Sequence, residues 1–183
     1  LAGGIIKLGV VARMMDRVEV TKDISPASTG LTLNTLASDG VGIAADVGLT
    51  LAAPVLLLPT LSAVVHDVGG TTYNLSSGIF YATSNRPLAT DQSVDVGLAF
   101  FPIIGKRGRA AIIFEAHDVT TISQETDSMK RYHAGVEFNI ADFFFLRGGM
   151  NQRYWTAGFE FATERFPLQG TTYGEEIGTA TAN

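Results

Sequence analysis

The segment from Gly42 to Ala52 reads GIAADVGLTLA, and its residues alternate in character with a period of two. Successive side chains of a β-strand point to opposite faces, so each face collects every second residue. One set is wholly apolar: Ile43, Ala45, Val47, Leu49 and Leu51. The other set is small or polar: Gly42, Ala44, Asp46, Gly48, Thr50 and Ala52. The segment therefore predicts a strand with one apolar face and one small, polar face.

The same alternation recurs along the chain. It predicts about nine strands, at residues 4–15, 42–53, 56–67, 93–101, 108–118, 131–140, 143–150, 153–163 and 166–173. Most of them have about the 9 to 11 residues that a tilted strand needs to cross a bilayer, whereas strands average about 5 or 6 residues in soluble proteins. This length favours an all-β fold, an antiparallel transmembrane β-barrel, over a soluble β-sandwich.

The links between the predicted strands differ in length. Long loops are expected at 16–41 and 68–92. Short links are expected at 54–56, 102–107, 141–142, 151–152 and 163–165. Short turns on one side and longer loops on the other are typical of outer-membrane barrels, although the last hairpins are short at both ends. Ser25 followed by Pro26 is also a helix-start signal, so a short helix through Ser38 is an open alternative within the first loop.

Composition and charge narrow the class of protein. The 183 residues suffice for one domain, and we expect residues 1–183 to form a single outer-membrane β-barrel domain. No apolar stretch reaches the roughly 18 to 20 residues of a membrane helix. The net charge of −5 disfavours nucleic acid as a partner, and the lack of cysteine excludes disulfides and thiolate metal sites. The first residues lead straight into a strand-like segment, which predicts a processed chain or part of a longer barrel without its flanking strands.

The small, polar faces carry few charges. The predicted set comprises Asp46, Asp95, Glu115, Glu137, Arg147 and Glu160. Four further cations, Lys7, Arg13, Arg109 and Arg131, fall on the same inferred face. An unpaired charge in a narrow interior is costly, so we expect ion pairs that fill a barrel lumen, with a polar path for a solute as the alternative. Arg147 should pair with Glu137 or Glu160, because tight hairpins make their strands neighbours.

No assembled catalytic or metal-binding set is apparent in the sequence. The histidines, His66, His117 and His133, lack the spacing of a helical zinc site and lie on separate predicted strands, so we expect them to be polar lining. A metal site built across strands is a weaker alternative. No GxSxG, P-loop or GxGxxG motif occurs. We therefore expect no enzyme activity, no catalytic residues, no metal and no cofactor.

Several short motifs resemble those of a family of outer-membrane barrels. They are Ala45-Asp46-Val47-Gly48-Leu49, Val64-Val65-His66-Asp67-Val68-Gly69, Tyr132-His133-Ala134-Gly135-Val136-Glu137-Phe138, Leu146-Arg147-Gly148-Gly149-Met150-Asn151 and Thr172-Tyr173-Gly174-Glu175-Glu176-Ile177-Gly178. Most of 42–178 resembles the family of PorV-type and conjugal-transfer TraF-like proteins, which are distant relatives of FadL-type transporters. The resemblance implies a barrel with more strands than are visible here. It also implies roles as varied as shuttling secreted cargo, accompanying conjugation genes and passing hydrophobic molecules, and no cargo-binding residue carries over.

The sequence thus predicts a bacterial outer-membrane β-barrel that acts in transport or as a secretion or assembly partner. Its expected partners are the lipid bilayer, with lipid or lipopolysaccharide contacts, and other proteins or a second copy of itself. Two alternatives stay open: a structural barrel with a plugged lumen that works through oligomerisation, and a soluble β-domain that acts as a binding module. Shared parity predicts that eight residues face lipid: Val47, Leu49, Leu51, Val96, Leu98, Phe114, Val136 and Phe159.

Overall fold

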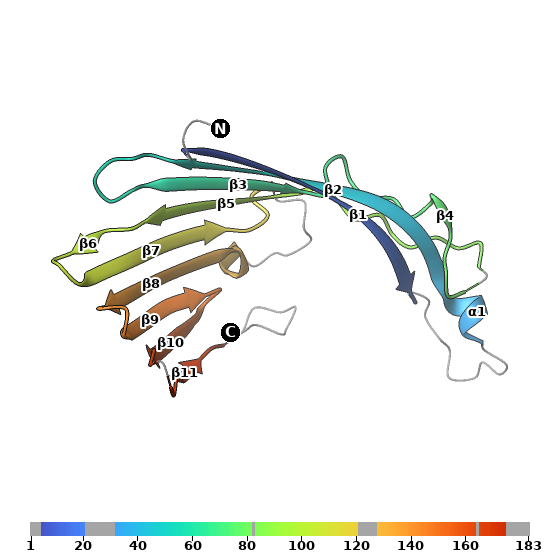
Figure 1. Ribbon diagram of the computed structural model, residues 1–183. Coiled ribbons are helices and arrows are strands. Elements are labelled where there is room, and N and C mark those ends of the chain that lie inside the picture. The colour runs from blue at the N-terminus through green and yellow to red at the C-terminus, as the bar shows by residue number, and fades with distance from the viewer. Residues whose placement is uncertain (1–4, 21–31, 82, 121–127, 164, 175–183) are drawn as a thin grey trace. The chain divides into compact units, whose positions relative to one another are not determined.

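A computed structural model of the chain describes residues 5–20, 32–81, 83–120, 128–163 and 165–174. Over these residues the protein is an antiparallel all-β structure, and its strands belong to one sheet of eleven (Figure 1). Helix is confined, in the same residues, to α1 (Leu33–Leu36) and the 3-10 turn η2 (Ser128–Arg131). The predicted all-β, antiparallel class is therefore confirmed.

The long strands follow one another through the sheet in chain order. They are β1 (Ile6–Glu19), β2 (Ser38–Ala52), β3 (Thr60–His66), β5 (Ser93–Phe100), β7 (Gly108–Ala116), β8 (Tyr132–Ile140), β9 (Phe144–Asn151), β10 (Tyr154–Phe161) and β11 (Leu168–Thr172). Two short strands lie off this path: β4 (Ser76–Ser77) pairs with β2, and β6 (Ile103–Ile104) pairs with β7. Each long strand lies where the alternation predicts one. No pairing joins β1 to β11 in the described residues, so closure into a barrel stays a prediction.

The boundaries of the first predicted loop need correction. β1 extends to Glu19 and β2 begins at Ser38, so the expected loop 16–41 is strand at both of its ends. Near the end of β1, the carboxylates of Asp16 and Glu19 accept hydrogen bonds from the backbone N–H groups of Ile79 and Leu88. Of the alternative helix, residues 25–31 lie outside the described residues, and α1 covers only 33–36.

The link between β2 and β3 is also longer than predicted. It runs over residues 53–59 instead of 54–56, because β3 begins at Thr60. Leu57 and Leu58 have φ angles of 73° and 43°, which a strand cannot accommodate. The backbone of Ala53 donates a hydrogen bond to Pro59 and closes this turn. Apolar residues in a turn thus looked like the start of a strand.

The chain divides into two compact units. Unit 1 comprises residues 1–9, 48–64 and 94–183, and unit 2 comprises residues 10–47 and 65–93. Unit 2 contains the predicted long loop 68–92, which is present and includes β4 and an isolated bridge between Thr71 and Thr90. The first half of β2, the residue before it and this loop form a small core together, in which Ala37, Val41, Ala44 and Tyr73 are buried.

In unit 1 the register of the strands confirms the predicted parity. Ile113, Gly135, Gly149 and Thr156 are cross-strand partners on β7, β8, β9 and β10 and share one face. Ile112, Val136, Gly148 and Ala157 make the neighbouring row on the opposite face. Every side chain predicted for one face of these strands therefore lies on that face.

Two tight turns hold this register. Ala141 and Asp142 have φ angles of 58° and 54°, and the Phe143 N–H donates to the Ile140 carbonyl, so residues 141–143 form a tight turn between the paired Ile140 and Phe144. The turn between β9 and β10 lies at Gln152 and Arg153, one residue later than predicted, because Asn151 still pairs with Tyr154.

Candidate functional site

The charged residues of β7, β8, β9 and β10 lie on one face of these strands, which we call the polar face. Cross-strand pairs place Glu115 opposite His133 and Glu137 opposite Arg147. Arg147 also faces Gly158, two residues before Glu160 on the same side of β10. Glycine, alanine or threonine lies at five other positions of this face: Ala111, Gly135, Gly149, Thr156 and Gly158. The parity argument thus located the polar face correctly.

Arg147 joins two carboxylates across three strands. Its Nε donates to Glu137 Oε2 at 2.6 Å, and its Nη2 lies 2.8 Å from Glu160 Oε2. The guanidinium fork suits two carboxylates, because its N–H groups point in several fixed directions in one plane. The predicted pairing of Arg147 with Glu137 or Glu160 is confirmed, with both partners engaged. Two carboxylates share one cation, so this cluster carries one net negative charge.

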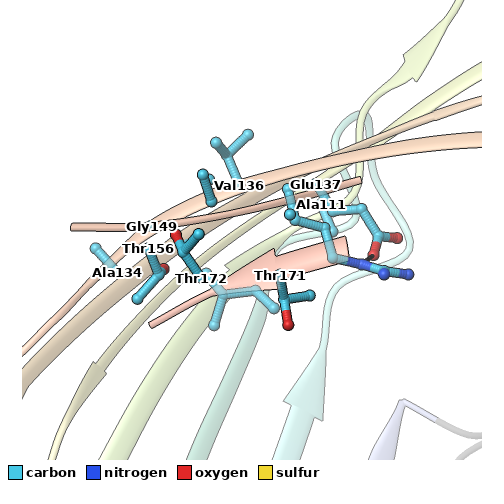
Figure 2. A pocket seen from close by; sticks show the side chains of 14 residues that line it. Ala111, Ala134, Val136, Glu137, Gly149, Thr156, Thr171 and Thr172 are labelled. Carbon is cyan, nitrogen blue, oxygen red and sulfur yellow. Dashed lines mark hydrogen bonds and ion pairs between the residues drawn. The ribbon is translucent and has the colours of Figure 1, made fainter. Parts of the chain in front are cut away.

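A hollow of about 350 Å³ lies beside this cluster on the polar face. In Figure 2, Glu137 and Ala111 lie at one end of the hollow, and Thr156 and Ala134 lie toward the other. Two glycines contribute to its floor for different reasons. A Cβ at Gly149 would lie 2.6 Å from the Ala134 carbonyl, whereas one at Gly135 would meet no atom closer than 4.0 Å. The hollow could therefore be filled from Gly135 without a clash at its Cβ.

A second group of polar residues lies at the other end of β5, β7 and β8. His117 Nδ1 lies 2.8 Å from Asp95 Oδ2, and His117 Nε2 lies 3.5 Å from Glu115 Oε1. The His133 ring meets the His117 ring edge-on, with 4.7 Å between centroids. Glu115 and His133 also line a hollow of about 280 Å³ together with Asn151. Asp95 and Glu115 are thus linked through a histidine that the charge pattern alone did not connect to them.

Asp46, the remaining predicted residue, belongs to unit 2. Its Oδ1 lies 2.8 Å from Arg13 Nη2 and accepts the backbone N–H of Asp67 at 3.0 Å. Arg13 also lies 3.4 Å from Asp67 Oδ1, and His66 Nδ1 lies 4.0 Å from Asp46 Oδ1. The six predicted residues therefore fall into three groups, one in unit 2 and two in unit 1. Of the further cations, Arg109 contacts Asp142 at 3.9 Å at a strand end.

The Asp46 and Asp95 groups repeat one local structure, which we call the carboxylate turn. In each, the backbone N–H of a left-handed aspartate, Asp67 with φ 48° or Asp118 with φ 47°, donates to the strand carboxylate. The next residue then donates its N–H at 2.8 Å to the carbonyl preceding that carboxylate: Val68 to Ala45, and Val119 to Val94.

A sequence signal for this turn exists and was missed. Asp-Val-Gly-Leu at 46–49 is followed by His-Asp-Val at 66–68, and the same letters recur at 95–98 and 117–119. A search for internal repeats would have placed His66 and His117 beside their carboxylates. The motif resemblance included the first copy but not its repetition.

Asp39 in unit 2 is a further residue that the sequence did not single out. It is fully buried, and its Oδ2 accepts the backbone N–H groups of Phe80 and Tyr81 at 3.0 and 2.6 Å. Arg86 donates to the Asp39 carbonyl at 3.0 Å. These bonds hold the loop 68–92 against β2, because buried backbone N–H groups need an acceptor.

Comparisons with protein-family models, with curated proteins and with solved structures found no match to the chain. The resemblance to PorV-type and TraF-like barrels therefore stays a prediction. No group of three histidine or carboxylate side chains is placed to hold a metal ion in the part of the chain that the structure describes. Within that same part, no helix has the length and apolar character needed to cross a membrane.

Proposed function

We propose that the chain forms the wall of a bacterial outer-membrane β-barrel that acts in transport or as a secretion or assembly partner. The exposed apolar face of unit 1 carries this proposal. Large apolar side chains on this face are between 38% and 81% exposed: Leu98, Phe114, Leu146, Trp155 and Phe159. Among the described residues of unit 1, Ala110 is the one hydrophobic residue that is buried.

A soluble sheet would bury this face against a second layer. Burial of apolar surface stabilises a fold by roughly 25 cal/mol per Å², and soluble monomers rarely expose contiguous apolar patches above a few hundred Å². A bilayer supplies the missing apolar surroundings, and a closed sheet satisfies its backbone hydrogen bonds internally. We therefore assign the face with Leu98, Phe114 and Phe159 to lipid.

The polar face then becomes the wall of the lumen. Its charges contact one another, as in the Glu137–Arg147–Glu160 cluster, which suits an enclosed space where an unpaired charge is costly. Small residues between these charges leave the hollows in which a solute could lie. We assign no catalytic, metal or cofactor role to this face, because its acids and bases bind one another and stand beside no activated nucleophile in the described residues.

The paired charges also favour a second candidate function. A lumen crossed by ion pairs is partly filled, as in a structural barrel that works through oligomerisation or through its loops. The two candidates differ in one measurable property, which is passage of a small solute. We favour transport or a secretion role because the hollows remain between the ion-paired groups.

Uptake of a small neutral sugar into liposomes containing the full chain tests the proposal. Gly135→Leu fills the polar-face hollow, and Gly148→Leu is the matched control on the opposite face, where a Cβ also meets no atom closer than 4.0 Å. We expect uptake by the parent, uptake several-fold lower in Gly135→Leu, and no change in Gly148→Leu.

Each other outcome has a defined meaning. A parent that inserts but passes no sugar would favour the plugged barrel. A parent that does not insert at all would overturn the membrane assignment. Equal loss in the Gly135→Leu and Gly148→Leu variants would remove the polar face as the path.

A further inference from the structure

The two carboxylate turns differ in the cation that binds the strand carboxylate. In unit 2, Arg13 contacts both Asp46 and Asp67, and His66 Nδ1 lies farther away, at 4.0 Å from Asp46 Oδ1. In unit 1, His117 itself contacts Asp95 at 2.8 Å and approaches Glu115 at 3.5 Å. Arginine stays charged at every accessible pH, whereas histidine is the side chain that changes charge between about pH 5 and 8.

The hydrogen-bonding capacity of His117 depends on its charge. A protonated imidazole has two N–H donors, one toward Asp95 and one toward Glu115, but a neutral imidazole has only one. The neutral ring can therefore satisfy Asp95 or Glu115, and its other nitrogen then presents a lone pair to the second carboxylate. Asp95 is the better acceptor for the one N–H group of the neutral ring, because its contact with His117 is 2.8 Å long and that of Glu115 is 3.5 Å.

Other titratable and charged residues lie near His117. The His133 ring on β8 meets the His117 ring edge-on, Asp118 follows His117 in the chain, and the backbone carbonyl of Arg131 accepts the backbone N–H of His117. The contacts of the His117 ring with Asp95 and Glu115 are the two that its protonation state changes.

We propose that the carboxylate turn of unit 1 is a pH-operated contact, in which protonated His117 bridges Asp95 and Glu115. When the proton leaves, the bridge to Glu115 breaks and its carboxylate presents an unmatched charge to the 280 Å³ hollow. The carboxylate turn of unit 2 is the pH-independent counterpart, because Arg13 holds Asp46. This contact exists whether or not the sheet closes in a membrane.

Loss of the bridge should also loosen the turn. Asp95 holds the left-handed Asp118 through its backbone N–H, and His117 fixes the position of that carboxylate. The hydrogen bond from protonated His117 to Asp95 joins two opposite charges, whereas the bond from the neutral ring has only one charged partner and is therefore weaker. Opening of the turn at Asp118 and Val119 should therefore become more frequent as the pH rises.

Amide hydrogen exchange of the full chain in detergent micelles, at pH 5.5 and 8.0 and corrected for intrinsic rates, tests the proposal. We expect protection at Asp118 and Val119 to fall about three- to tenfold at the higher pH, and protection at Asp67 and Val68 to stay constant. His117→Gln, which keeps one donor but cannot be protonated, should abolish the change. His66→Gln is the matched control in the other turn and should leave the change at Asp118 intact.

Glu115→Gln provides a second variant in case His117→Gln does not fold, and it should reduce the pH effect while leaving the Asp95 contact in place. The proposal is overturned if the parent shows no pH effect at Asp118, or if His117→Gln retains it. An equal pH effect in both turns of the parent would also overturn it, because Arg13 should hold the first turn at either pH.

Discussion

The two units of this chain stabilise their sheets in different ways. Unit 2 has a small buried core, in which Val41, Ala44 and Tyr73 are at most 5% exposed. Unit 1 has long paired strands and almost no buried hydrophobic residue among those described. Both units contain strands with the same alternating pattern. They therefore differ in whether other residues cover these strands.

The strand β2 shows this difference within one segment. Asp39, Gly40, Val41 and Gly42 are all buried, so both faces of the strand are covered at that end. A Cβ at Gly40 would overlap the carbonyl of Tyr73, and one at Gly42 would lie 2.6 Å from the carbonyl of Thr72. Glycine is required there because the backbone of the loop 68–92 passes directly over the strand. Farther along, Leu49 and Leu51 are each 38% exposed.

Unit 2 therefore carries its own cover, whereas nothing in the described residues covers the apolar face of unit 1. Removal of amphiphile is the strongest test of this difference. We expect the chain to lose monodispersity in size exclusion without detergent, because the apolar face of unit 1 would be exposed to water. A clean monomer without amphiphile would contradict both the barrel proposal and the contrast between the units.

A charge on the apolar face should have the next largest effect. Leu49→Arg in unit 1 should destabilise the protein in bilayers by about 2 to 4 kcal/mol if the residue lies near the midplane, because arginine is costly on a lipid face. Thr50→Arg, one residue along on the opposite face, is the control and should cost much less. Reversible unfolding in liposomes measures both variants, and equal stability of Leu49→Arg and the parent would show that this face does not meet lipid.

Loss of the hydrogen bonds that hold the loop 68–92 on unit 2 should lower the stability somewhat less. Asp39→Ala leaves the N–H groups of Phe80 and Tyr81 without their acceptor, which should destabilise unit 2 by about 2 to 3 kcal/mol. Asp39→Asn keeps an acceptor oxygen and should cost less. Hydrogen exchange at residues 80 and 81 reports the local effect, and unchanged protection in Asp39→Ala would mean that the carboxylate does not hold the loop.

The smallest effect is expected at the ion pairs of the polar face. Arg147→Met alone leaves Glu137 and Glu160 without their shared cation. This change should lower the free energy of unfolding by about 1 to 2 kcal/mol, since the cluster is only partly shielded from water. Combining it with Glu137→Gln and Glu160→Gln should recover part of this loss. A triple variant less stable than the single one would show that the carboxylates have stabilising partners other than Arg147.

Much of unit 1 was predictable from local pattern. The period of two assigns each residue of the strands β7, β8, β9 and β10 to a face, and tight hairpins force the order of β8, β9 and β10. The pairing of Arg147 with two carboxylates follows from that order. The carboxylate turns were also encoded, as a repeated motif, but alternation says nothing about strand ends, and the link from His117 to Asp95 was therefore missed.

The sequence by itself determined the class of structure and the division of residues between faces, because strand geometry converts alternation directly into sidedness. Only the tertiary structure decided which part of β2 is covered and which cation contacts each carboxylate turn. It also decided that Asp39 binds the loop at Phe80 and Tyr81, which lie 41 and 42 residues later in the chain. These features depend on contacts between segments far apart in the chain. No local period encodes such contacts, because they arise only after the loop has folded onto the strand.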